Sequence, residues 1–275
     1  MSRITETFDA LRKAQRKALI PFITAGDPTP DFTVPSLHAM VAAGADVIEL
    51  GVPFSDPMAD GPVIQKASER ALAQRMSLRR TLDLVAEFRR DDSRTPIVLM
   101  GYLNPIESMG YGDFATRAKQ AGVDGVLTVD MPPEESEELL PLLLDAGIDP
   151  IFLLAPNSTA ARIEAMSRLG RGYLYYVSLK GVTGAGHLDL AEVERKLAEI
   201  RAHSGLPVGV GFGVKNAETA AAIAGFADSV VVGSALVSQI ERCAGRPEEA
   251  RQAIVGLLRE MRAAMDARTA GGGQS

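Results

Sequence analysis

The junction Ala43-Gly44-Ala45-Asp46-Val47-Ile48-Glu49-Leu50-Gly51 predicts the end of a helix followed at once by a strand. Residues 47–51 are a short and nearly continuous apolar run, which is typical of a strand covered on both faces. Gly44 stands where the helix would end, because glycine adopts the left-handed cap conformation without steric cost. The same junction recurs at Ala121-Gly122-Val123-Asp124 and at Ala146-Gly147-Ile148-Asp149.

Short apolar runs of this kind alternate with helical stretches along the chain. The predicted strands are residues 18–24, 47–51, 97–101, 125–129, 150–154, 173–177, 208–211 and 229–233, and predicted helices include 78–90, 134–146, 190–203 and 248–265. Alternating strands and helices predict a parallel sheet, and eight strands in about 250 residues fit an α/β fold of the (β/α)8 TIM-barrel type. A doubly wound open sheet fits less well, because no G-x-G-x-x-G follows the first strand.

The domain organisation follows from the same pattern. We expect one barrel domain over residues 1–267 and a disordered tail over residues 268–275. Ile4, Phe8 and Leu11 recur at helical spacing, so residues 1–17 are predicted to form an amphipathic helix packed on the barrel. This segment lacks the apolar run of a signal peptide, and no stretch resembles a membrane span, so the expected location is the cytoplasm.

Composition excludes several classes of protein. The chain of 275 residues is 46% hydrophobic and 23% charged, which is typical of a folded globular protein and not of a disordered one. Its formal net charge of −6 argues against a dedicated nucleic-acid binder. The single cysteine, Cys243, cannot form an internal disulfide, and three scattered histidines do not suggest a metal site.

Glu49 is the first candidate for chemistry, because chemistry in such a barrel belongs at the carboxyl ends of the strands. Side chains alternate along a strand, so Glu49 faces the barrel interior if Ile48 and Leu50 face the helices. A carboxylate there loses hydration, its pKa rises, and it can donate and accept protons near neutral pH. A buried glutamate paired with a basic side chain for stability is the competing interpretation.

Asp60 is the second candidate. It lies in the loop Pro53-Phe54-Ser55-Asp56-Pro57-Met58-Ala59-Asp60-Gly61-Pro62, which follows the predicted second strand and can fold back over Glu49. Two carboxylates with different burial can take different roles, one moving protons and one remaining ionised. Turn formation is the competing interpretation for Asp60, and we interpret Asp56 as a loop or contact residue.

Glycine-rich loops follow the last three predicted strands. Gly211-Phe212-Gly213-Val214 and Gly233-Ser234-Ala235 occupy the usual phosphate site of such barrels, where Ser234 can add a hydroxyl, so we predict a phosphorylated substrate. Residues 178–186 contain three glycines and are predicted to form a mobile lid. Side chains near the strand ends would form a flat apolar slot, namely Phe22, Tyr102, Leu127, Tyr175 and Phe212.

The segment Leu50-Gly51-Val52-Pro53-Phe54-Ser55-Asp56-Pro57-Met58-Ala59-Asp60-Gly61-Pro62 is close to a family signature, and the chain resembles the alpha subunits of tryptophan synthase over nearly its whole length. Tyr102-Leu103-Asn104-Pro105, Gly181-Val182-Thr183-Gly184 and Gly211-Phe212-Gly213 appear in the expected order. The resemblance implies a (β/α)8-barrel lyase that cleaves indole-3-glycerol phosphate to indole and glyceraldehyde 3-phosphate. The resemblance also implies that this retro-aldol reaction needs no cofactor or metal in this chain.

The resemblance also implies a role for each matching residue. Glu49 would transfer the protons, and Asp60 would hold the indole N–H and stabilise the developing positive charge. The indole pocket would be lined by Phe22, Tyr102, Leu127, Tyr175 and Phe212. Thr183 would be the lid residue that meets Asp60 on closure. Phosphate would be held by Gly184, Gly213, Gly233 and Ser234.

A partner is implied as well. In this family a beta subunit that carries pyridoxal phosphate receives indole through a tunnel and makes L-tryptophan, in an α2β2 heterotetramer. The residues expected to face it are Pro53, Asp56, Pro57, Asn104 and Pro105.

Three alternatives remain at this point. A Schiff-base aldolase on the same barrel would use Lys180 or Lys215, although both stand among glycine or polar neighbours rather than in a desolvating pocket. A free-standing indole-3-glycerol phosphate lyase would share all the catalytic residues but not depend on a partner. A non-catalytic barrel would only regulate a partner, and the presence of both Glu49 and Asp60 argues against it.

Overall fold

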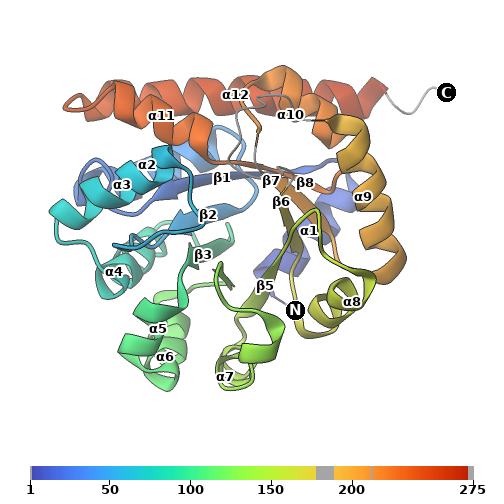
Figure 1. Ribbon diagram of the computed structural model, residues 1–275. Coiled ribbons are helices and arrows are strands. Elements are labelled where there is room, and N and C mark those ends of the chain that lie inside the picture. The colour runs from blue at the N-terminus through green and yellow to red at the C-terminus, as the bar shows by residue number, and fades with distance from the viewer. Residues whose placement is uncertain (1, 178–188, 212, 272–275) are drawn as a thin grey trace.

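Eight parallel strands close into a barrel in the computed structural model, which describes residues 2–177, 189–211 and 213–271 (Figure 1). Each strand pairs with the next, and β8 returns to β1 with Ala18 opposite Ser229. The strands are β1 (Ala18–Thr24), β2 (Ile48–Gly51), β3 (Ile97–Gly101), β4 (Gly125–Thr128), β5 (Asp149–Leu154), β6 (Leu174–Val177), β7 (Val208–Gly211) and β8 (Ser229–Val232). The predicted (β/α)8 barrel is therefore confirmed.

Helices surround the barrel as an outer ring, apart from α1, which lies across one end of it (Figure 1). They are α1 (Arg3–Lys13), α2 (Pro30–Ala42), α3 (Pro62–Ala73), α4 (Leu78–Phe88), α5 (Leu103–Met109), α6 (Tyr111–Ala121), the 3-10 turn η1 (Pro133–Glu135), α7 (Leu139–Ala146), α8 (Ala160–Leu169), α9 (Leu190–His203), α10 (Ala217–Ala224), α11 (Ser234–Arg242) and α12 (Pro247–Gly271). None of these described helices has the length and apolar character that a membrane crossing requires.

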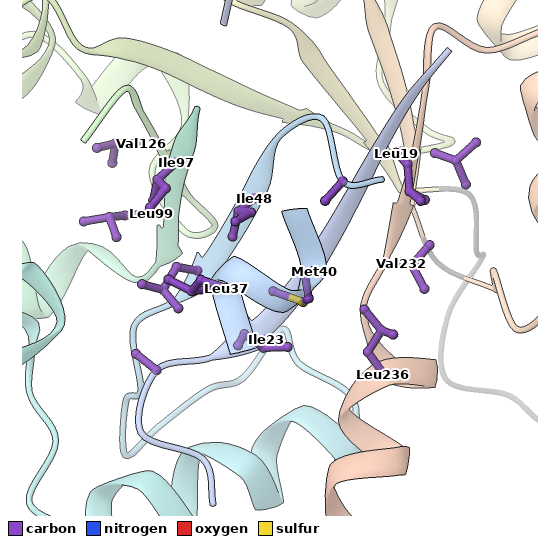
Figure 2. Packing of buried hydrophobic residues seen from close by; sticks show 14 of the residues in the cluster. Leu19, Ile23, Leu37, Met40, Ile48, Ile97, Leu99, Val126, Val232 and Leu236 are labelled. Carbon is purple, nitrogen blue, oxygen red and sulfur yellow. The ribbon is translucent and has the colours of Figure 1, made fainter. Parts of the chain in front are cut away.

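The core has two layers, because strand side chains alternate between the helices and the barrel interior. Ile48 and Leu50 belong to the layer between sheet and helices, whereas Val47 belongs to the interior cluster. Figure 2 shows Leu37 and Met40 of α2 packed beside the strands in the outer layer. Glu49 therefore faces inward, as the alternation predicts.

Helix α1 closes the amino-terminal end of the barrel. Ile4, Phe8 and Leu11 pack into the interior cluster, and Arg3 Nη1 lies 2.6 Å from Asp124 Oδ1. The helix ends at Lys13 instead of residue 17, because Gln15 adopts a left-handed conformation with φ of 53° that breaks the helical path.

The helix expected over residues 134–146 is shorter in the structure. The chain forms η1 first, and α7 begins only at Leu139. This start places Pro141 in the first turn, where no backbone N–H is needed, whereas a start at residue 134 would put the proline inside the helix.

The last helix is longer than expected. α12 runs to Gly271, and the Thr269 hydroxyl donates to the backbone oxygen of Asp266 at 3.0 Å within its final turns. The predicted disorder therefore does not apply to residues 268–271, and residues 272–275 lie outside the described part of the chain.

Candidate active site

A cavity of about 260 Å³ opens at the carboxyl ends of the strands. Both candidate carboxylates, Glu49 and Asp60, line it. The complete lining is Phe22, Glu49, Asp60, Gly61, Ile64, Met100, Tyr175, Gly213, Val214, Lys215, Val231, Gly233, Ser234 and Ala235. The cavity therefore brings together residues from β1, β2, β3, β6 and β8, from the loops after β2, β7 and β8, and from α3 and α11.

Glu49 is fully buried in β2, between Phe22 of β1 and Val98 of β3 in the strand register. The Tyr173 hydroxyl donates a hydrogen bond of 2.6 Å to Glu49 Oε1, and Oε2 has no hydrogen-bond partner among the described residues. Burial raises the pKa of Glu49 to about 7, and the bond from Tyr173 opposes this rise only in part. A carboxyl group with this pKa can both give and take a proton at neutral pH.

The raised pKa predicts a pH-dependent stability. The folded protein keeps the Glu49 proton up to about pH 7, whereas the unfolded chain releases it near 4.5, so the free energy of unfolding falls as pH rises between these values. Glu49→Gln lacks this cost, so at pH 8 its free energy of unfolding should exceed that of the parent protein by about 3 kcal/mol. At pH 4 most of that difference should disappear. Urea titrations of both proteins at the two pH values measure it, and equal stability at pH 8 would contradict the buried, uncompensated carboxylate.

Asp60 ends the loop that follows β2 and stands two residues before α3. Its backbone N–H donates to the Pro57 oxygen at 3.0 Å, and its own backbone oxygen accepts from Gln65 Nε2 at 2.8 Å. These bonds fix the end of the loop. Burial raises the pKa of the Asp60 carboxyl to about 6, and the Tyr102 hydroxyl acts in the opposite direction.

The loops after β7 and β8 form a candidate anion site. Gly213 has a φ of 81°, a conformation that favours glycine, and Gly233 precedes α11. The backbone N–H groups of Ser234 and Ala235 have no hydrogen-bond partner among the described residues. Both residues line the cavity at the positive end of the α11 dipole, and a helix N-terminus of this kind binds phosphate in other barrels.

Two aromatic residues of the predicted apolar slot line the cavity directly. Phe22 and Tyr175 do so from β1 and β6. Tyr175 crosses closely over β7, where a Cβ atom on Gly211 would lie 1.9 Å from the tyrosine oxygen. Because Gly211 has no side chain, the Tyr175 ring can occupy this space.

The other slot residues are placed differently. Tyr102 lines a small adjoining cavity together with Asp60, and its hydroxyl accepts the Ala59 N–H at 3.1 Å. Leu127 is buried in the interior cluster with Val98 and does not reach the 260 Å³ cavity. Phe212, Lys180, Thr183 and Gly184 lie outside the described residues, as does the predicted lid.

Several residues at the cavity were not singled out from sequence. Ile64, Met100 and Val231 belong to the cavity wall. Tyr173 does not line the cavity, but it is the most important of these residues because its hydroxyl holds Glu49. The alternation along β6 carried a signal for Tyr173, because it shares a face with Tyr175 two residues later.

The segments expected to contact a partner lie together on the surface. The rings of Phe54 and Tyr102 pack together with a centroid distance of 5.3 Å. Tyr102 directly precedes α5, and α5 contains Asn104 and Pro105. Pro53 is buried, Pro57 is half-buried, and Asp56 and Asn104 are exposed. Met58, in the same loop, is 84% exposed.

A larger concave region of about 960 Å³ lies at the opposite, amino-terminal end of the barrel. Its cationic residues are Arg12, Arg16, Lys17, Arg201 and Arg268. Three of these lie in the last turns of α1, α9 and α12, where positive charge complements the helix dipole. This region is remote from both carboxylates.

Lys215 stands at the mouth of the 260 Å³ cavity, and its side chain is exposed. A Schiff-base nucleophile needs a desolvated amine, so this position does not favour the aldolase alternative. No group of three or more His, Cys, Asp or Glu side chains suited to a metal ion occurs among the described residues.

The fold and the site define a class, a (β/α)8-barrel enzyme in which two carboxylates of raised pKa share a cavity with a helix N-terminus suited to phosphate. Comparison with known proteins identifies the family within this class of barrel enzymes. Residues 8–266 match the family model described as tryptophan synthase alpha chain. The chain belongs to the tryptophan synthase alpha chain family and is therefore a lyase of tryptophan biosynthesis.

The similarity covers whole proteins. The tryptophan synthase alpha chain of Methylococcus capsulatus is 74% identical over 267 residues, which is 97% of this chain and 100% of the relative. That of Thioalkalivibrio sulfidiphilus is 62% identical, with coverage of 97% and 100%. The crystal structure of tryptophan synthase subunit alpha from Legionella pneumophila has a TM-score of 0.91 at 45% identity and covers 97% of this chain and 99% of that one.

Proposed function

We propose that this chain cleaves indole-3-glycerol phosphate to indole and D-glyceraldehyde 3-phosphate, with Glu49 and Asp60 as its catalytic residues. The observation that supports the proposal is that Glu49 and Asp60 line the same cavity as Ser234, the first residue of α11. One substrate can then place its phosphate at Ser234 and its indole ring between Phe22 and Tyr175. The wall of the cavity is otherwise largely apolar, as an indole ring requires.

Cleavage of the carbon–carbon bond between the indole ring and the side chain needs two proton transfers, one to the ring carbon and one from the side-chain hydroxyl. Protonated Glu49 gives its proton to the ring carbon that carries the side chain, which leaves a positive charge on the indole nitrogen. The Glu49 carboxylate then takes the proton of the side-chain hydroxyl, the hydroxyl carbon becomes the aldehyde, and the carbon–carbon bond breaks. The bonding electrons return to the ring and neutralise it as indole. A pKa of about 7 suits a group that takes part in both protonation states.

Asp60 acts on the charge that develops during this reaction. As a carboxylate it accepts the indole N–H and stabilises the positive nitrogen, so its effect is greatest in the protonated intermediate and the transition states around it. Its pKa of about 6 leaves most of it ionised at neutral pH. The difference between the two carboxylates thus matches two roles, proton transfer for Glu49 and charge stabilisation for Asp60.

The proposed phosphate site predicts the effect of a charge at Ser234, the first residue of α11. Ser234→Asp places a carboxylate against the substrate phosphate, so KM should rise at least tenfold, roughly the effect of 1.4 kcal/mol. Ser234→Ala is the matched control, because it removes only the hydroxyl and should change KM much less. Steady-state kinetics of indole release measure both. An unchanged KM in Ser234→Asp would place the phosphate elsewhere.

We further propose that the chain works with a beta subunit that carries pyridoxal phosphate, in an α2β2 heterotetramer in the cytoplasm, and needs no cofactor of its own. Structures similar to this chain include tryptophan synthase of Mycobacterium tuberculosis in its aminoacrylate-bound form, at 35% identity and a TM-score of 0.85. The loop containing Pro53, Asp56 and Pro57 also carries the exposed Met58, and it ends at Asp60, which lines the active-site cavity. Asn104 and Pro105 follow Tyr102, whose ring packs against Phe54 of the same loop. Indole released from the cavity would pass to the partner across this face.

The deciding experiment measures indole release from indole-3-glycerol phosphate in EDTA, with and without a beta subunit. Release that persists in EDTA and rises with the partner supports the reaction, the absence of a metal requirement and the assembly. A fast rate that the beta subunit does not change would favour the free-standing lyase. No release in either condition would favour the non-catalytic barrel.

The aldolase alternative has its own test. Borohydride added during turnover would trap a substrate adduct on Lys215 or Lys180 if a Schiff base formed. We expect no such adduct, and a trapped lysine would overturn the carboxylate mechanism.

A further inference from the structure

Thr24 carries a buried hydroxyl group that no described residue satisfies. It is the last residue of β1, only 1% of it is exposed, and its Oγ1 has no hydrogen-bond partner in the described part of the chain. Alternation places it on the same inner face as Ile20 and Phe22, whereas Ile23 packs against the helices. A hydroxyl group without a partner in such a place is costly, so its retention calls for an explanation.

Thr24 lines a second cavity, which shares Phe22 and Asp60 with the active-site cavity. This cavity has a volume of about 10 Å³, and Asp60 and Tyr102 line it as well. Its other lining residues are Phe22, Gly51, Val52, Ile64, Ser68, Met100, Gly101 and Val129. A volume of about 10–15 Å³ accommodates one water molecule, provided that two to four polar partners surround it. Thr24, Asp60 and Tyr102 supply such partners.

We propose that this cavity holds one structural water molecule that bridges Thr24 Oγ1 and the Asp60 carboxylate, which makes Thr24 a positioning residue for Asp60. The water donates one hydrogen bond to the carboxylate and accepts one from the Thr24 hydroxyl. The inference rests on the role of Asp60 in the proposed function. It adds a residue on β1 that acts on the substrate only through Asp60.

The surroundings of Asp60 explain why such a water matters. The titratable groups near it are Tyr102 from the residue before α5, Tyr175 from β6, Glu49 from β2 and Lys215 from the loop after β7. Lys215 is the single cation of this set. It is exposed at the cavity mouth and, within the described part of the chain, forms no ion pair with Asp60. Hydrogen bonds from neutral donors must therefore hold Asp60 in its ionised form, and each one lowers its pKa.

Thr24→Val tests the inference, because valine keeps the shape of threonine and removes the hydroxyl. We expect the pKa of Asp60, followed by carbon NMR of its carboxyl group, to rise in this variant. We also expect kcat to fall roughly tenfold with little change in KM, since a hydrogen bond to a charged group is worth about that factor. Thr24→Ser should restore both values. A high-resolution crystal structure should show the water in the parent protein and in Thr24→Ser, but not in Thr24→Val.

Thr128→Val is the matched control. Thr128 ends β4, is also buried, and also has a hydroxyl without a partner among the described residues. It does not line the cavity, and its neighbours Leu127 and Val129 occupy the inner face instead. Its replacement should leave the pKa of Asp60 and kcat unchanged.

Two results would overturn the inference: an empty cavity in the crystal structure of the parent protein, or an unchanged pKa of Asp60 in Thr24→Val. Neither readout depends on turnover. If the parent protein failed to release indole, the proposed function would fall, while the water and the pKa would still decide the link between Thr24 and Asp60.

Discussion

Glu49→Gln should lower kcat for indole release by a factor of roughly 10²–10⁴, because the variant loses the group that moves both protons. Glutamine is nearly the same size and can still accept the Tyr173 hydrogen bond, so the cavity keeps its shape. Substrate affinity should therefore change little. Single-turnover measurements with saturating substrate separate the chemical step from binding.

Glu87→Gln is a suitable control for this change. Glu87 lies on α4 with an exposed side chain, so its replacement makes the same chemical change away from the cavity and should leave kcat unaltered. A second check comes from stability, since Glu49→Gln is expected to unfold less readily at pH 8 while losing activity. Poor folding cannot produce that combination. Near-normal turnover in Glu49→Gln would remove Glu49 from its proposed role.

Asp60→Asn should lower kcat by roughly 10²–10³, the usual cost of removing one group that stabilises developing charge. The asparagine can still meet the indole N–H with its amide oxygen, but it brings no negative charge to the positive nitrogen. The loss should therefore fall mainly on kcat and less on KM. Initial rates over a range of substrate concentrations give the two values separately.

Asp56→Asn is the matched control, measured on this chain alone. Asp56 belongs to the same loop and is exposed, and its carboxylate contacts the Ser55 hydroxyl at 2.6 Å instead of the cavity. The replacement of Asp56 should leave kcat and KM near their original values. If Asp60→Asn and Asp56→Asn had equal, small effects, charge stabilisation would have to come from another residue.

Much of the fold could be predicted because its signals are local. A glycine that ends a helix and an apolar run that follows it are both visible within ten residues, and the eight predicted strands lie within a residue of the observed ones. The errors occur where local signals compete. Pro141 moves the start of α7, and the glycine-rich composition of the tail did not show that α12 continues to Gly271.

The site shows a different limit. The alternation of side chains within one strand was enough to predict that Glu49 faces the barrel interior. The position of Asp60 in the loop after that strand was enough to predict that it lies near Glu49. Tyr173, by contrast, reaches Glu49 across the barrel from a position beside β6. Which side chains meet across the interior depends on the stagger of all eight strands, and no local pattern encodes that stagger.

The pairing of β1 with β8 also has a consequence for how the chain folds. Ala18 and Ser229 are neighbours in the barrel but lie at nearly opposite ends of the sequence, so the final closure must bring together segments made early and late in synthesis. Until β8 arrives, β1 has an open edge that can pair with other chains. Contacts so distant in sequence slow folding, and they favour populated intermediates in a chain of this length. The first strand made is thus among the last to be protected, and aggregation during synthesis is the hazard that accompanies this architecture.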